Sequence, residues 1–299
     1  MIKKLLPVVL VTLLGLTLVG IKVYPDIKAL IASKKIEEAT NKQKPNNLNG
    51  KHPVKEEKFP FRLPAEEEYA KKYPNQFKIV KKMYFSMNYI KNAEGEYEEN
   101  HHDKDGISHM QFYTDFDQRK NRANFEKIIN GKIVETIQVL LKDGIVLRQR
   151  PNKHIFTRQR EEKNDNHFIG LFNNVTNSEW WALIYNNYPD WSYKEGKKFG
   201  MPVYKIKGNI TDKVSESLQG PFTMVVSKET GALLDLKCYG HESKEILSIT
   251  VRKIKINQGI SNDVFHLDIS GSKKISNMEF NISDIENYEE KTGGTDTSK

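Results

Sequence analysis

The feature that most constrains the fold is an alternation of apolar and polar residues, repeated between turn signals along most of the chain. Such an alternation puts one face of a strand into a core and the other into water. It predicts strands over 107–117, 121–129, 132–141, 145–149 and 154–159, with Asn-Gly and Asp-Gly turns at 130–131 and 143–144. Strands joined by such tight turns pair antiparallel, so the pattern predicts a meander.

The alternation continues on both sides of this run. Between 77 and 90 the odd positions are apolar except for Lys81, which predicts one long strand there. Further strands are predicted over 202–208, 222–228, 233–240, 246–256 and 264–269. The stretch 64–72 suits a short helix that starts at Pro64 and is closed by Pro74. The expected fold class is therefore mainly β with few helices (α+β).

One segment with a helical signature interrupts the strands, TNSEWWALIYNNYP at 176–189. Its large side chains are too many for a single buried stripe. They are Trp180, Trp181, Ile184 and Tyr185. Two interpretations stay open: a lid helix that offers some rings to a ligand or partner, or a helix wedged tightly against the sheet.

The amino terminus carries a candidate membrane segment. Two lysines precede seventeen uncharged, mainly apolar residues at 5–21, near the lower limit for a helix that spans a bilayer. No small-residue cleavage site follows, and a lipoprotein signal would need a cysteine there, whereas the only cysteine is Cys238. We therefore expect an uncleaved signal anchor over 1–24, in a single-pass protein of the cell membrane. Lysines also follow the segment, so the expectation that the domain lies outside the cytoplasm is based on the short basic start and on the resemblance described below.

Composition divides the rest of the chain into three parts. Residues 25–63 combine a short juxtamembrane helix with a linker rich in Pro, Asn and Lys. The predicted strands and helices fall within 64–275, which we expect to form one domain. The remainder, 276–299, is polar and ends in EEKTGGTDTSK, which is typical of disordered tails.

The stretch PFTMVVSKETGALLDLKCYGHESKEILSITVRKIKINQGISNDVFHLD, at 221–268, resembles the closing hairpins of the LolA/RseB-like superfamily. The long strand predicted at 77–90, the INGK and KDG turns and GMPVYKIKG agree with it, so the resemblance covers about 64–270. It is a pattern of strands and turns and contains no catalytic signature. It implies a strongly curved antiparallel sheet, an unclosed half-barrel whose concave apolar face is covered by helices and, in the lipoprotein carrier of the family, holds acyl chains.

With its expected anchor, the chain is similar to membrane-anchored members of the Gram-positive type. Such bacteria have no outer membrane to supply, so carrier activity does not transfer automatically. The predicted lining of the concave face shares one phase of the alternation: Phe85, Met87, Phe112, Phe116, Val139, Leu141, Met224 and Val226. Methionines among aromatic residues suit an adaptable pocket. A packed core without a cavity has the same alternation, so both interpretations stay open.

Two polar stretches are candidate sites by composition. HHDKDGISH at 101–109 is rich in metal-ligand types, but neighbouring residues of an extended chain point to opposite sides. We interpret it as a solvated hairpin loop and predict no metal site. The run RQRPNKHIFTRQR, at 148–160, has its cations at even positions, which predicts that they gather on the outer face of two paired strands. They are Arg148, Arg150, His154, Arg158 and Arg160.

The remaining sequence argues against catalysis. There is no phosphate loop, nucleophile elbow or HExxH motif, and we predict neither an enzyme nor a cofactor. A net charge of +8 favours anionic surroundings, yet the aromatic residues are not interleaved with basic ones as nucleic acid would require.

Two functional hypotheses follow. In the first, a membrane-anchored extracytoplasmic protein binds a lipid or lipoprotein acyl chain in its concave face. In the second, an envelope regulatory, sporulation or germination module docks a protein partner without carrying lipid.

Overall fold

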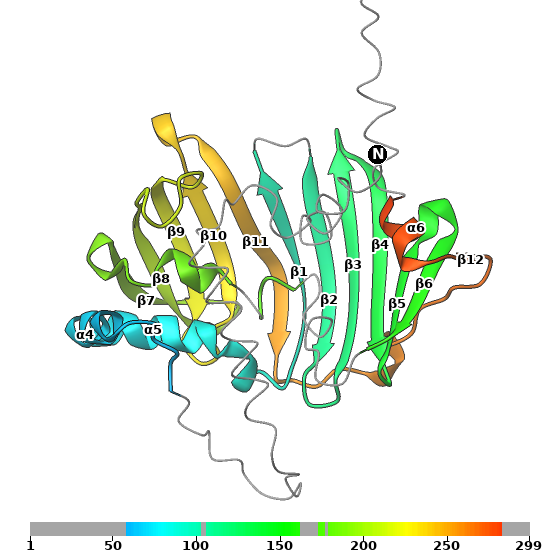
Figure 1. Ribbon diagram of the computed structural model, residues 1–299, viewed down its shortest axis with the longest axis horizontal. Helices are drawn as coiled ribbons and strands as arrows, with labels where there is room; N and C mark the ends of the chain where they lie inside the picture. The colour runs from blue at the N-terminus through cyan, green and yellow to red at the C-terminus, as the bar shows by residue number, and fades with distance from the viewer. Residues whose placement is uncertain (1–57, 103–105, 162–172, 177–178, 283–299) are drawn as a thin grey trace, which may run out of the picture.

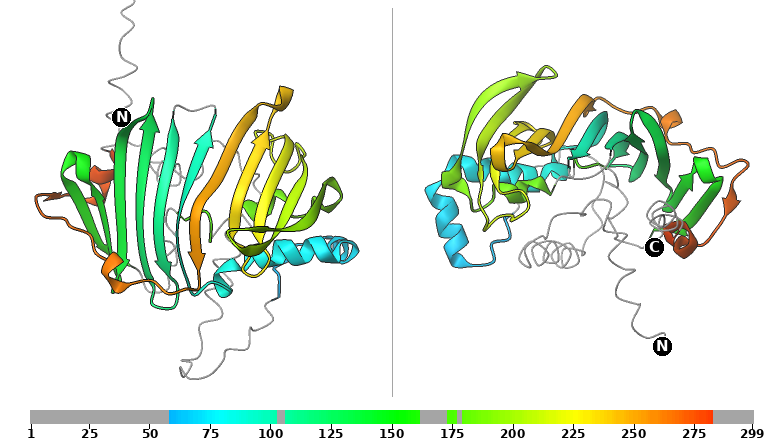
Figure 2. Two further views of the ribbon diagram at one scale, coloured as in Figure 1. Left: turned by 180° about the vertical axis from the view of Figure 1, so that it is seen from behind. Right: turned by 90° about the horizontal axis from the view of Figure 1, so that it is seen from above.

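The computed structural model describes residues 58–102, 106–161, 173–176 and 179–282. A single 12-stranded sheet has the order β12-β6-β5-β4-β3-β2-β1-β11-β10-β9-β8-β7 and curves into an open half-barrel (Figure 1; Figure 2). Every neighbouring pair is antiparallel except β12 with β6. The prediction of a mainly β fold with an unclosed, curved sheet and few helices is confirmed.

The first half of the sheet is a meander of six strands. They are β1 (Asn92–His101), β2 (Ile107–Asp115), β3 (Lys120–Ile129), β4 (Lys132–Lys142), β5 (Ile145–Arg150) and β6 (Ile155–Arg160). Asn130 and Asp143 have φ angles of 51° and 53°, and each precedes a glycine that also has a positive φ. This is the backbone that two-residue hairpins require, so the predicted turns and the five strands between 107 and 160 are confirmed.

The second half is a meander of five strands that returns to the first. They are β7 (Trp191–Lys198), β8 (Met201–Ile210), β9 (Gly220–Ser227), β10 (Leu233–Tyr239) and β11 (Glu245–Ile256). β11 pairs with β1, with a register shift after Glu96. The strands predicted between 202 and 256 are confirmed, whereas β7, an edge strand rich in lysine, was not predicted.

The long strand predicted over 77–90 is wrong. The short helix predicted at 64–72 is present as α4 (Pro64–Lys72), and it is followed by helix α5 (Pro74–Tyr84) and the 3-10 turn η1 (Ser86–Asn88). Pro74 begins α5, because proline fits the first turn of a helix. Ile79, Val80 and Met83 are buried, a spacing that suits a helical stripe, and Lys81 falls outside that stripe.

β1 escaped prediction because its composition hides its alternation. Its inward positions include Ala93 and Gly95, and its outward positions include Glu94 and Glu96. These glutamates pair with lysines of β11 on the convex face: Glu94 with Lys255 at 2.7 Å and Glu96 with Lys253 at 2.6 Å. The apolar signal is therefore absent although burial alternates along the strand.

After β11 the chain crosses the convex face as a strap, residues 257–272, which contains the 3-10 turn η6 (Asn262–Val264). Phe265 and Leu267 of the strap are buried against Leu140 of β4, in a small cluster apart from the main core. The strand predicted over 264–269 is wrong, because this alternation reflects packing on the sheet and not strand pairing.

The strap leads to the other face of the sheet. Lys273 and Lys274 form β12 on the edge of β6, and helix α6 (Asn277–Ile282) then lies on the concave side (Figure 2). This helix falls within the tail that was predicted from 276 onward, and 283–299 lie outside the described residues.

The anchor predicted over 1–24 and most of the following linker also lie outside the described residues. Within the ranges that the structure describes, no helix is both long enough and apolar enough to cross a membrane. The end of the predicted linker is packed: Phe59 is 3% exposed, with its ring centroid 4.9 Å from that of Tyr84 in α5.

Candidate functional site

The concave face of the sheet gathers most of the buried apolar side chains. The described helices lie at its two ends, α4 and α5 beside β7–β10 and α6 beside β5 and β6 (Figure 2). Between these ends β2, β3 and β4 carry a row of buried apolar side chains, which we call the central strip. Its members, each at most 5% exposed, are Met110, Phe112, Ala123, Phe125, Ile137, Val139 and Leu141. The register places them on one face, with Ala123 between Phe112 and Val139.

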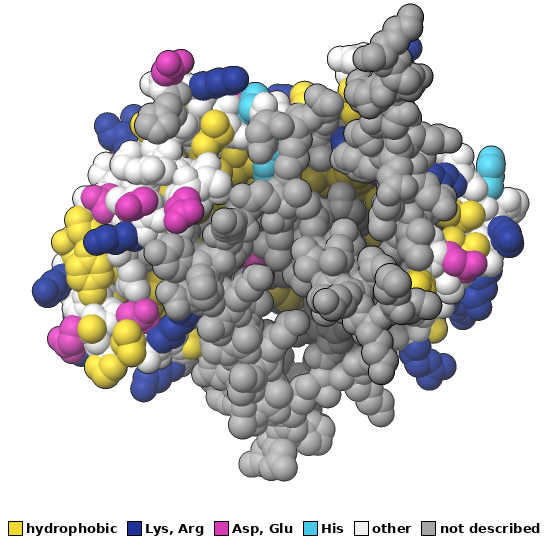
Figure 3. Space-filling model, turned by 45° about the horizontal axis from the view of Figure 1, so that its top comes forward, with side chains coloured by type: hydrophobic (Ala, Val, Ile, Leu, Met, Phe, Trp, Pro, Cys, Tyr) yellow, Lys and Arg dark blue, Asp and Glu magenta, His cyan; other side chains and the backbone are white. Residues whose placement is uncertain are grey.

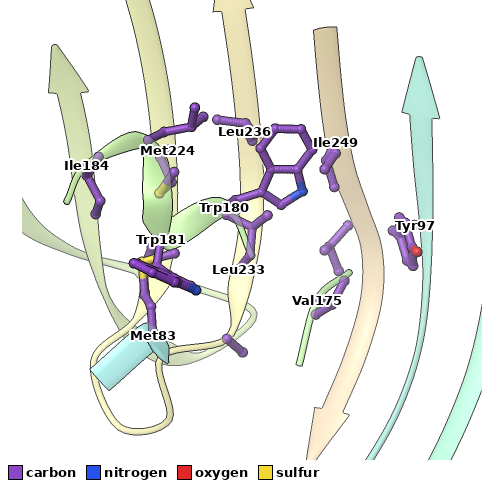
Figure 4. Packing of buried hydrophobic residues seen from close by; sticks show 14 of the residues in the cluster. Met83, Tyr97, Val175, Trp180, Trp181, Ile184, Met224, Leu233, Leu236 and Ile249 are labelled. Carbon is purple, nitrogen blue, oxygen red and sulfur yellow. The ribbon is translucent and has the colours of Figure 1, made fainter. Parts of the chain in front are cut away.

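The end of the concave face at β8–β11 is a packed core, which we call the packed end (Figure 4). Trp180 and Trp181 are 8% and 5% exposed, and Ile184 is fully buried. Figure 4 shows Trp181 beside Met83 of α5 and Trp180 beside Leu236 of β10. Within the described residues, these side chains are wedged against the sheet.

The helix predicted over 176–189 is largely absent. The structure has two 3-10 turns in its place, η3 (Trp180–Leu183) and η4 (Tyr188–Asp190), and 177–178 lie outside the described residues. Asn186 between them has a φ of 53°, a left-handed backbone that no helix continues through. Tyr185 is partly buried, and its hydroxyl donates to Glu66 Oε2 at 2.8 Å, which ties the turn to α4.

Five of the eight predicted lining residues lie on the concave face of the sheet. Phe112, Val139 and Leu141 belong to the central strip and are fully buried. Met224 and Val226 lie on β9 in the packed end, 0% and 1% exposed. The prediction therefore combined residues from two regions, because an alternating pattern does not show which helices cover which strands.

The other three lining residues lie off the sheet. Phe116 follows β2, and its amide donates to the Lys91 carbonyl at 2.8 Å. Phe85 and Met87 lie at the end of α5 and in η1, partly buried against the core. They are misplaced because the strand to which they were assigned is a helix.

A short segment, residues 173–176, lies across the inner side of β1 and β2 and was not predicted as part of a site. Asn173 Nδ2 donates to Thr114 Oγ1 at 3.1 Å and to Thr176 Oγ1 at 2.6 Å. Thr114 donates to Asn121 Oδ1 at 2.9 Å, and Ser86 donates to the Thr176 carbonyl at 2.6 Å. All five side chains are at most 3% exposed. Such a buried polar network specifies one position for the segment.

Asn174 joins the same segment to β1. The backbone amide of Asn174 donates to Tyr97 Oη at 3.2 Å, and its side-chain Nδ2 donates to Glu99 Oε2 at 3.0 Å. Burial, and to a smaller extent the nearby Glu99 charge, raises the pKa of the Tyr97 hydroxyl above its ordinary value. This hydroxyl therefore stays protonated at neutral pH as a fixed part of the inner wall.

The arginines of the basic run divide between the two faces of the sheet. Arg148 pairs with Thr157 on the concave side, whereas Arg158 pairs with Leu147 on the convex side. Arg148 and Arg150 are 9% and 3% exposed. The prediction that these cations gather on the outer face is wrong, because the register of a hairpin decides which positions share a face.

The histidines of the HHDKDGISH stretch meet three different glutamates. The pairs are His101 with Glu99 at 2.7 Å, His102 with Glu245 at 3.0 Å and His109 with Glu126 at 3.2 Å. Residues 103–105 lie outside the described ranges. Within those ranges, no three His, Cys, Asp or Glu side chains are grouped so that they could hold a metal ion.

Comparison by sequence finds no similar protein: no protein-family model matches the chain, and no curated protein matches it. Comparison by structure finds several. The complex of MucA and MucB from Pseudomonas aeruginosa is 8% identical, with a TM-score of 0.37 over 71% of this chain and 64% of that one. The lipoprotein LppX of Mycobacterium tuberculosis is 11% identical, with a TM-score of 0.36 over 63% of this chain and 98% of that one.

A LolA superfamily protein from Nitrosomonas europaea is also similar. It is 10% identical, with a TM-score of 0.26 over 64% of this chain and 98% of that one. Each of these likenesses is at low identity and concerns the fold alone.

Proposed function

We propose that this protein is a non-catalytic, membrane-anchored extracytoplasmic protein that binds an apolar ligand, a lipid or lipoprotein acyl chain, on the central strip. The observation that supports this proposal is the strip itself, seven buried apolar side chains side by side on the concave side of an unclosed sheet. An acyl chain needs no polar partner there, because removing apolar surface from water contributes about 25 cal/mol per Å². The central strip therefore matches the chemistry of such a ligand.

The two sides of the central strip would confine the ligand. On one side, the segment 173–176 is fixed over β1 and β2 by buried hydrogen bonds. On the other side, α6 lies beside β5 and β6 (Figure 1). An acyl chain between them would cross β2, β3 and β4, which pack side by side about 4.8 Å apart.

Residues 5–21 would anchor the domain to the membrane. A linker such as 25–57 could extend to about 100 Å, at roughly 3.3 Å for each residue. Lysine and arginine side chains are spread around the visible edges of the molecule (Figure 3). Together with the net charge of +8, they favour a location next to anionic lipid head groups.

Mass spectrometry of lipid bound to the full-length protein tests the proposal. We expect acyl lipid to be extracted from protein purified out of membranes, and Ile137→Thr in the central strip to reduce its amount. Ile133→Thr is the matched control, because Ile133 lies on the same strand but is 53% exposed. A protein that carries no lipid and binds no hydrophobic dye would contradict this function.

The alternative is that an envelope regulatory, sporulation or germination module docks a protein partner. The packed end favours this alternative, because Trp180 and Trp181 already fill part of the concave face. The edge strand β7 adds a surface to which an extended segment of a partner could pair. Photo-crosslinking tests this alternative, with a photoreactive residue placed at Ser192 in β7 and, as a control, at Asn152 in the β5–β6 turn. We expect one specific adduct with a partner protein from position 192 and none from position 152.

A further inference from the structure

Two buried arginines lie where the central strip ends. Arg148 and Arg150, on β5, are 9% and 3% exposed. Val146 on the same strand is fully buried and pairs with Leu141 of the central strip, and Val139 pairs with Arg148. The apolar surface therefore leads directly to two guanidinium groups on the same face.

The guanidinium of Arg148 donates to two separate oxygens of α6. Its Nη1 lies 3.4 Å from Asn281 Oδ1, and its Nη2 lies 3.2 Å from Asn277 Oδ1. Asn277 Nδ2 in turn donates to Gln159 Oε1 at 2.5 Å, which holds this amide in place. A guanidinium binds a carboxylate or a phosphate in the same way, with each of two nitrogens donating to one oxygen.

Phe280 of α6 covers both arginines. Its ring centroid lies 5.0 Å from Cζ of Arg148 and 4.7 Å from Cζ of Arg150, and the side chain is 2% exposed. Arg150 also forms an ion pair with Glu135 of β4. These contacts from α6 come from the neutral residues Asn277, Phe280 and Asn281, whereas Glu279 of the same helix is exposed and accepts a hydrogen bond from the Ser276 amide.

The hydroxyl of Thr157 is an independent indication of a ligand. Thr157 faces Arg148 across the β5–β6 pair and is 1% exposed. Its Oγ1 has no hydrogen-bond partner in the part of the chain that the structure describes. A buried hydroxyl without a partner is unfavourable, and the Thr157 hydroxyl could donate a hydrogen bond to an oxygen of a ligand at Arg148.

We infer that Arg148, Arg150 and Thr157 form a binding site for the anionic head group, a carboxylate or a phosphate, of an amphiphile whose apolar part lies on the central strip. This inference rests on the proposed function and specifies its ligand. In the present structure α6 occupies the site, with the amide oxygens of Asn277 and Asn281 in the positions that two head-group oxygens would take. Ligand binding therefore replaces the contacts of Asn277 and Asn281 with Arg148.

The test compares a fluorescent fatty acid, cis-parinaric acid, with its methyl ester on the full-length protein. We expect the acid to bind at least about tenfold more tightly, because charge-assisted hydrogen bonds are the stronger ones. Arg148→Met should abolish this preference and leave ester binding unchanged. Arg158→Met, on the exposed convex side of β6, should keep it. Competition by dodecyl phosphate and by dodecanoate shows which head group is preferred.

Two further variants keep both arginines, so they test the site even if Arg148→Met fails to fold. Asn277→Asp places a fixed carboxylate beside Arg148, so it should weaken binding of the acid several-fold and leave the ester unaffected. Phe280→Ala removes the cover and should strengthen binding of the acid. Equal binding of acid and ester to the wild type, or unchanged acid binding by Asn277→Asp, overturns this inference alone. Failure of both probes to bind overturns the proposed function with it.

Discussion

Gly231 lies directly against the backbone of Lys82: a β-carbon on Gly231 would be 2.3 Å from the Lys82 carbonyl oxygen. Gly231 has a φ of +77° in the turn between β9 and β10, and Lys82 belongs to α5. The hairpin and the helix therefore touch backbone to backbone, and only glycine fits this approach. The contact sets the position of α5 at the packed end.

Gly231→Ala should therefore destabilise the protein strongly. Alanine in this left-handed conformation costs about 1–2 kcal/mol by itself, and the clash with Lys82 adds to that cost. Gly144→Ala is the matched control, because Gly144 has a φ of +69° but nothing within 4 Å of the added carbon. In urea unfolding, Gly231→Ala should lose at least twice the free energy that Gly144→Ala loses. Equal losses would show that the approach to α5 is unimportant.

Asn173→Ala should release the segment 173–176 from the inner wall. The change removes the hydrogen bonds to Thr114 and Thr176 in a site that is 1% exposed. We expect a loss of about 1–3 kcal/mol in the free energy of unfolding, because buried partners remain unsatisfied. Asn152→Ala, at an exposed turn position, should change it by less than about 0.5 kcal/mol. Similar effects of the two changes would argue against a structural role for the network.

Stability should fall at alkaline pH through Cys238. Burial raises the pKa of its thiol from 9.0 to about 12, and the Glu245 charge contributes less. Between these values the unfolded chain has released the proton and the folded protein keeps it, so rising pH favours unfolding by about 1.4 kcal/mol for each pH unit. The contribution is intact below pH 9.

Urea unfolding between pH 8 and pH 11 measures this effect. The free energy of unfolding of Cys238→Ala should fall less steeply above pH 9 than that of the wild type. Tyr185 and Tyr188, whose pKa values are also raised by burial, contribute equally to both proteins. Parallel curves would therefore mean that the Cys238 thiol is not shielded from ionisation.

Phe265→Ala should loosen the strap on the convex face. Phe265 is 2% exposed and packs with Leu140 and Leu267 in a cluster separate from the main core. Because that cluster is small, the strap should detach before the sheet unfolds. Limited proteolysis should cut within 257–272 several-fold faster than in the wild type, with cleavage sites assigned by mass spectrometry. Phe199→Ala is the control, because Phe199 is 41% exposed. If the protease first cleaves Phe265→Ala inside the sheet, the expectation is wrong.

Local pattern was sufficient for most of the sheet. Strands β2 to β6 and β8 to β11 have alternating residues or clear turn signals, and each pairs with a neighbour in sequence except where β11 meets β1. Pairing between sequence neighbours depends on turn chemistry, which a sequence displays directly. The curved, unclosed sheet was expected from the resemblance of the closing hairpins.

The hydrophobic pattern gave wrong predictions where tertiary contacts decide between a helix and a strand. Ile79 and Met83 suit a strand and a helix equally, and α5 is a helix because its stripe packs on the sheet. β1 shows the reverse case, since its glutamates find cations only after β11 pairs beside it. Neither neighbour is visible in the local sequence.

For the candidate site, the sequence by itself determined that an apolar face exists, because strand geometry fixes the alternation of side chains. It determined Phe112, Val139 and Leu141 as members of that face. Only the tertiary structure decided that Met224 lies in a packed core and that Arg148 faces inward. The physical reason is that register and covering helices depend on contacts between residues far apart in the chain, whereas alternation depends on neighbours alone.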